Sequence, residues 1–243
     1  EVSTDGTAWS TYAAADLNSS LTFSNITQST WYRVVVQNGV CPEGYSESIK
    51  VTVNTCATSF TQGFWGGTQG SGKDCKGISV SEILTRILVS APKVGTAEKG
   101  LTLNDAAKLR TLMPGGGYVK NVFEGAYTLN PYTLPNSYID NKSKKLNSVL
   151  VSQTIALRLN TLYNSQLGSI AFEHNKNILQ TAKVNYSSGC SVGSVATTAS
   201  YTMSSKVLCY LFSNSAYTKD VNGLLALANN VIGGALPIVK NAP

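Results

Sequence analysis

The chain has 243 residues and a formal net charge of +6, and only 13% of its residues are charged, against about a quarter in typical globular proteins. This length allows one large or two ordinary domains. No run of roughly 18 apolar residues occurs, so we expect no membrane span. The basic residues are scattered, whereas nucleic-acid binders concentrate them on one face. Low charge with abundant Ser, Thr and Asn favours a rigid extracellular protein.

Residues 1–54 carry the signals of short β-strands. In the stretch WYRVVVQNG, strand alternation places Tyr32, Val34 and Val36 on one face. In SESIKVTV it places Ile49, Val51 and Val53 inward. We therefore predict the C-terminal part of an immunoglobulin-like or fibronectin-like β-sandwich. Such a sandwich needs about seven strands, and because fewer signals are present we expect the front strands to precede residue 1.

Residues 55–243 change to helical periodicity and predict an α+β domain. Helices are expected over 78–89, with Ser79 or Ser81 as N-cap, and near 105–112, with Thr102 or Asn104 as N-cap. Further helices are expected over 146–164 and 221–234, with short strand signals between 165 and 210. The segment 146–164 is apolar on more than one side, which predicts the buried centre of this domain.

The five cysteines are widely spaced and form no CxxC pair, which favours disulfides over a zinc site. Four of them bracket the second domain and allow three pairings: Cys56, Cys75, Cys190 and Cys209. We favour bridges between the 56–75 and 190–209 segments, because these close the longest loops. Cys41 is then either free or paired with a cysteine before residue 1.

The residues that could carry catalysis do not form a recognisable set. Gly67 to Lys73 fit the spacing of a phosphate-binding loop, but Asp74 follows where a Ser or Thr hydroxyl should bind magnesium. His174, the single histidine, lies in a polar stretch without a nucleophile motif. We predict no enzyme, no metal site and no cofactor, and keep a glycoside hydrolase with two facing carboxylates as the less favoured alternative.

Four tyrosines cluster in the loop-rich segment 114–140: Tyr118, Tyr127, Tyr132 and Tyr138. Exposed aromatic rings stack on the apolar faces of sugars, which would make this segment a carbohydrate-binding surface. The favoured alternative is that these rings pack loops that contain few aliphatic side chains.

Several short segments resemble, in the same order, a module of secreted proteins of Bacteroidota. They are TQGFWGG (61–67), LTLNDAAKLRTLMPGGG, VSQTIALRLNTLYNSQLGSI and LLALANNVIGG, and together they cover about 56–236. Residues 1–54 resemble the repeats, with STDGTTW and YRV-x-V-x-NG-x-C elements, that precede such modules in large adhesins. The resemblance implies an extracellular or cell-surface cargo of the type IX secretion system, linked to adhesion or gliding motility. It also implies partners among surface or secretion-system proteins or surface glycans, and it supplies no catalytic residues.

Overall fold

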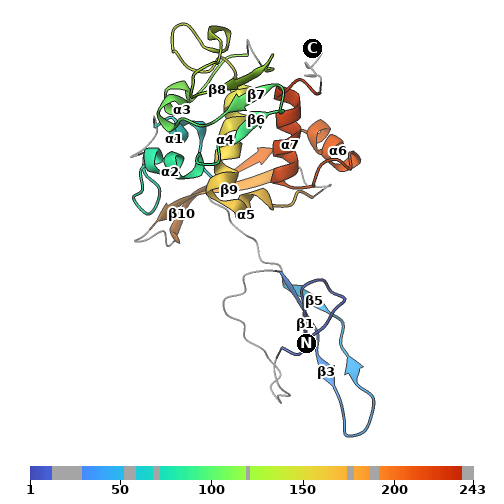
Figure 1. The fold of residues 1–243 in the computed structure, drawn as a ribbon. Helices are drawn as coiled ribbons and strands as arrows, with labels where there is room; N and C mark the ends of the chain where they lie inside the picture. The colour runs from blue at the N-terminus through green and yellow to red at the C-terminus, as the bar shows by residue number, and fades with distance from the viewer. Residues whose placement is uncertain are drawn as a thin grey trace. The chain divides into compact units, whose positions relative to one another are not determined.

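A computed structural model describes residues 1–12, 29–51, 59–67, 72–118, 121–173, 178–186 and 192–236 (Figure 1). The chain divides into two compact units, Glu1–Cys56 (unit 1) and Ala57–Pro243 (unit 2).

Unit 1 consists of short antiparallel strands. One sheet has the order β1 (Val2–Ser3), β2 (Thr30–Tyr32) and β5 (Ile49–Val51), and β3 (Val35–Val36) pairs with β4 (Gly44–Tyr45). In the three-stranded sheet Tyr32 lies opposite both Val2 and Ile49, so these three side chains share one face.

The predicted β-sandwich is wrong for the described part of unit 1. Its strands are two or three residues long, and none of its described hydrophobic side chains is buried; the buried residue there is Ser3. A sandwich core forms only where the inner faces of two sheets interdigitate. Ile49, which alternation placed inward, is 70% exposed.

Unit 2 mixes helices with small sheets (Figure 1). Strands β6, β7 and β8 form a sheet in that order, antiparallel and then parallel, and β9 pairs with β10 in a long antiparallel hairpin. In chain order the elements are α1 (Gln62–Trp65), α2 (Val80–Ile87), β6 (Lys93–Gly95), β7 (Gly100–Thr102), α3 (Ala106–Leu112), β8 (Ala126–Thr128), η1 (Asn136–Tyr138), α4 (Val149–Tyr163), α5 (Ser165–Gly168), β9 (Ile178–Tyr186), β10 (Val192–Thr202), α6 (Ser205–Ser213) and α7 (Val221–Ile232).

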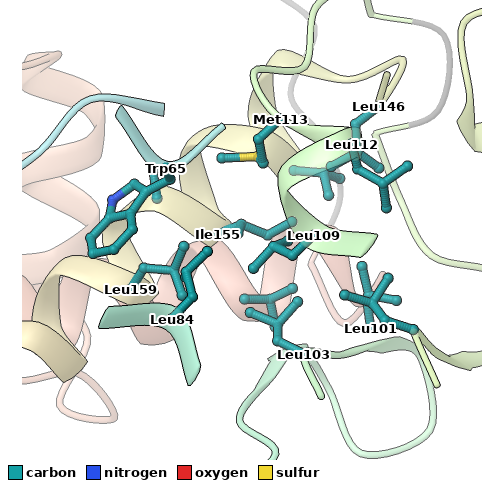
Figure 2. Close-up of a cluster of buried hydrophobic side chains, with 14 of the residues drawn as sticks. Trp65, Leu84, Leu101, Leu103, Leu109, Leu112, Met113, Leu146, Ile155 and Leu159 are labelled. Carbon is teal, nitrogen blue, oxygen red and sulfur yellow. The ribbon is translucent and has the colours of Figure 1, made fainter. Parts of the chain in front are cut away.

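Helix α4 is the centre of unit 2, which confirms the prediction for residues 146–164. Figure 1 shows it between α2 and α3 on one side and α7 on the other. Its buried residues Ile155 and Leu159 pack with Trp65 of α1 and with leucines of α2, β7 and α3 (Figure 2). A second, smaller apolar cluster lies between α6 and α7.

Helices α2 and α3 each begin at a residue whose side chain accepts a backbone N–H of the first turn. Ser79 caps α2 by accepting the backbone N–H of Glu82, as one of the two predicted caps. For α3 the predicted caps Thr102 and Asn104 are wrong, because the Asp105 carboxylate accepts the N–H of Lys108 instead. The side chain of Asn104 is instead bonded to Asn130 and Thr128.

The segments that carry the resemblance pack against one another. A Cβ on Gly66 would lie 2.4 Å from the carbonyl oxygen of Met113, so TQGFWGG abuts the loop after α3. Ser152 of α4 binds both segments, donating to Gln62 at 2.5 Å and accepting from Gly115 N–H at 2.9 Å. These motifs are therefore packing elements around α4.

The prediction of two disulfides among Cys56, Cys75, Cys190 and Cys209 is wrong for Cys209. Cys209 is free and exposed on α6, because its neighbours Leu208 and Leu211 turn the apolar side of that helix inward. Cys41 is also free and exposed. Cys75 is disulfide-bonded; Cys56 and Cys190 lie outside the described residues, so no bridge joins two described cysteines.

Candidate functional site

The loop with phosphate-loop spacing is held by its aspartate. Both oxygens of the Asp74 carboxylate accept hydrogen bonds, from the N–H groups of Lys76 and Ile78 at 2.9 and 2.8 Å and from the Tyr163 hydroxyl at 3.0 Å. Asp74 is 8% exposed and ties this loop to α4. It stands where the motif requires a magnesium-binding hydroxyl, so the structure gives that position a structural role. Residues 68–71 lie outside the described part of the chain.

Ionisable groups do not gather into a metal site in the described residues. No three His, Cys, Asp or Glu side chains lie close enough together there to hold an ion. The candidate His174 lies outside that part of the chain. Within the same residues no helix is both long and apolar enough to cross a membrane.

An open hollow of about 330 Å³ lies beside the first turn of α3. Its one amide-bearing side chain, Asn104, uses both its oxygen and its nitrogen in bonds to residues 128–130. The hollow offers polar and apolar surface in about equal measure; it is lined by Thr85, Leu88, Val89, Ala91, Asn104 and Ala106.

The four tyrosines of the 114–140 segment occupy different environments. Tyr138 is 2% exposed, its ring lies 5.4 Å from that of half-buried Tyr127, and its hydroxyl accepts from Glu124 N–H and donates to Val122 O. Burial raises the pKa of Tyr138 far above the usual range. Tyr132 is 39% exposed, with the Lys108 ammonium 3.9 Å from its ring centroid, and Tyr118 is 78% exposed. Two of the four rings are thus core or half-buried, and the other two are exposed.

On one face of unit 1, two cationic side chains stack on aromatic rings of the same unit. We call this side the aromatic–cation face; its residues are Trp9, Trp31, Arg33, Tyr45 and Lys50. The Arg33 guanidinium lies between two rings, 4.3 Å from the Trp9 centroid and 4.2 Å from that of Tyr45, and it binds the Glu1 carboxylate at 2.6 Å. The Lys50 ammonium lies 5.3 Å from the Trp31 ring. Stacked cations shield the rings from water while remaining solvated themselves.

Turns on this side of unit 1 are fixed by local hydrogen bonds. The Asp5 carboxylate accepts from the N–H groups of Thr7 and Ala8, at 2.7 and 2.8 Å. These bonds hold the pKa of Asp5 well below its usual range. Gly6, at φ +80°, passes under Trp31, where a Cβ would lie 3.3 Å from the ring. The DG turn therefore supports the tryptophan.

Among the described residues of unit 1, those assigned to the opposite face are neither acidic nor basic, and we call it the uncharged face: Val2, Tyr12, Thr30, Tyr32, Val34, Val36, Ile49 and Val51. Pairing places Thr30 opposite Val51 and Tyr32 opposite Ile49, and the Tyr12 ring contacts that of Tyr32 at 5.7 Å. Sequence alternation extends this assignment to Val34 and Val36, although Val34 lies between β2 and β3 and Val36 belongs to the separate β3–β4 sheet.

Four side chains of the uncharged face are exposed, and the other four, Val2, Thr30, Tyr32 and Val51, are half-buried. Val34, Val36 and Ile49 are 61%, 64% and 70% exposed, and Tyr12 is 47% exposed. Sequence alternation identified which residues share this face, and it missed the exposure, since that depends on whether another layer covers the sheet.

A family model described as a domain of unknown function, DUF8696, matches residues 1–55, the part that forms unit 1. Neither the curated proteins nor the solved structures include a match to the chain.

Proposed function

We propose that this chain is a structural or adhesive protein of the cell surface, and that it makes contact through the uncharged face of unit 1. The observation that carries the proposal is the exposure of Val34, Val36 and Ile49 on a face without acidic or basic groups. Exposed apolar patches rimmed by polar residues mark interaction sites, because a partner removes apolar surface from water.

The proposed setting is outside the cell. The resemblance to repeats and modules of large Bacteroidota adhesins supports export by the type IX system and a part in adhesion or gliding. A charged fraction of 13% is consistent with a surface whose polarity comes from hydroxyl and amide groups. Partners among surface proteins, secretion-system proteins or surface glycans belong to the same proposal, which assigns no catalytic step to the chain.

The test uses a bacterium that carries this protein, with the gene deleted and restored. Brief protease treatment of intact cells should digest the restored protein, and disabling type IX export should protect it. A double variant, Val34→Lys with Ile49→Lys, should lower cell attachment several-fold while expression is unchanged. Val89→Lys is the matched control, since Val89 is 83% exposed in unit 2.

Two results would refute the proposal. One is a protein that stays protected from protease until the cells are broken. The other is a double variant that reaches the surface and supports attachment as well as the Val89→Lys control.

A further inference from the structure

We propose that Asn38 is a site of spontaneous covalent modification, at which the side-chain amide is lost through a cyclic imide formed with the main chain. Asn38 precedes Gly39 in the loop that joins β3 to β4. Asparagine is a thermally labile residue, and this reaction needs a following backbone nitrogen that can rotate onto the side chain. Glycine leaves that nitrogen the most freedom. The chain has one other Asn-Gly pair, Asn222-Gly223, which serves as an internal comparison.

The turn at Asn38 leaves the reacting atoms open. Every residue of the 37–43 loop is exposed, and Val40 is fully exposed. The Cys41 N–H donates to the Asn38 carbonyl at 3.1 Å and closes a β-turn in which Gly39 has φ +57°. A Cβ on Gly39 would meet nothing within 4 Å. In the described part of the chain no hydrogen bond uses the Gly39 N–H or the Asn38 side chain, so nothing there holds the two reacting groups apart.

The second Asn-Gly pair is held by the fold. Gly223 lies in the first turn of α7, and its N–H donates to the Asp220 carboxylate at 2.9 Å. A Cβ on Gly223 would lie 1.8 Å from the Thr218 carbonyl oxygen, so this stretch of backbone is closely packed. The Asn222 side chain is itself exposed. Exposure therefore does not distinguish the two pairs, whereas the freedom of the following amide does.

The reaction needs no co-reactant except water. The backbone nitrogen of Gly39 loses its proton, attacks the side-chain carbonyl carbon of Asn38 and forms a new C–N bond. The bond from that carbon to the amide nitrogen breaks, and the nitrogen leaves as ammonia with the proton returned to it. Water then opens the five-membered imide at either carbonyl, which gives aspartate, or isoaspartate with the main chain running through the side-chain carbon. In sum, an amide and water give a carboxylic acid and ammonia.

The products change both the charge and the geometry of the hairpin. Either acid lowers the formal net charge of +6 by one. Isoaspartate also adds a methylene group to the main chain of the loop. The loop sets the register of the hairpin, in which Val35 lies opposite Tyr45 and Val36 opposite Gly44. The modification therefore accumulates with the age of the protein and alters the β3–β4 hairpin without an enzyme.

The experiment is incubation of the full chain at neutral and mildly alkaline pH, followed by peptide mapping with mass spectrometry and chromatographic separation of isoaspartyl peptides. In the folded protein, Asn38 should be converted at least several-fold faster than Asn222. Conversion should be faster at the higher pH, since the deprotonated amide is the nucleophile. In guanidinium chloride the two pairs should be converted at similar rates, because unfolding frees Gly223. Asn38→Ser, a change in an exposed loop, should lack the more acidic species that ion exchange separates from the aged wild type.

Three results would overturn the inference. One is a folded protein that keeps the Asn38 amide throughout the incubation. Another is equal conversion of Asn38 and Asn222 in the folded protein, which would show that the fold does not select between them. The third is an Asn38→Ser variant that forms the more acidic species as fast as the wild type, since the modified residue would then lie elsewhere.

Discussion

The hydrogen bonds between Asn160 and Phe60 hold the start of unit 2 on its central helix. Asn160, 5% exposed in α4, donates from Nδ2 to the Phe60 carbonyl at 2.8 Å, and its Oδ1 accepts the Phe60 N–H at 2.8 Å. The two residues are 100 positions apart in the chain. We predict that Asn160→Ala destabilises unit 2 and loosens the segment that leads into α1.

The size of the effect follows from the groups that lose a partner. Leaving a buried donor or acceptor unpaired costs about 1–3 kcal/mol, so the two Phe60 groups together would cost about 2–6 kcal/mol if fully buried. Because Phe60 is half-buried, water should reduce this sum to about 2–4 kcal/mol. The better helix propensity of alanine offsets about 0.5 kcal/mol. A net loss of roughly 1.5–3.5 kcal/mol corresponds to a fall in Tm of about 3–14 °C for a unit of this size.

Thermal and urea unfolding of the full chain, followed by circular dichroism and tryptophan fluorescence, measures this loss. Gln153→Ala is the control, because Gln153 is exposed on the same helix. Equal melting temperatures for Asn160→Ala and the control, within about 1 °C, would refute the reasoning.

Asn160→Asp separates the hydrogen bonds from packing. The introduced carboxylate still accepts the Phe60 N–H, but it faces the Phe60 carbonyl without a proton to donate. Burial and that carbonyl should raise its pKa above the usual value of about 3.9. A group with a raised folded-state pKa stabilises below its unfolded pKa and loses that contribution as the pH rises. The deficit relative to wild type should therefore be smallest in acid and grow toward neutral pH, and a deficit independent of pH would contradict this account.

Three further outcomes are expected. Gly66→Ala places a Cβ 2.4 Å from a backbone oxygen and should cost about 1–3 kcal/mol by urea unfolding, whereas Gly116→Ala, which meets nothing within 4 Å, should cost much less; equal costs would contradict the packing role. Because burial raises the pKa of Tyr138, its neutral form stabilises the fold below the unfolded value of about 10 and this stability is lost as the pH rises. In an alkaline titration followed by tyrosinate absorbance, one class of tyrosines should therefore ionise only as the protein unfolds, and Tyr138→Phe should remove the contribution of that class. Native maleimide labelling with peptide mapping should modify both Cys41 and Cys209 before any reduction; protection of either would contradict its free, exposed state.

Local patterns were enough to predict several elements of this fold. The helical spacing over 146–164 predicted α4, and Ser79 as a possible N-cap marked the start of α2. Alternation placed Tyr32 and Val34 on one face of the first unit. These features depend on side chains within a few positions of one another, so the order of residues by itself determines them.

Other properties depend on contacts between distant parts of the chain. Alternation placed Ile49 inward, yet Ile49 is 70% exposed. For Tyr138 the sequence left a sugar-binding surface and loop packing as alternatives, and its side chain is 2% exposed. Likewise Cys209 gave no sequence signal that it would be free. Burial is decided by which layer covers a face, and a disulfide by which sulfur atoms approach, so only the tertiary structure determines the uncharged face and the state of each described cysteine.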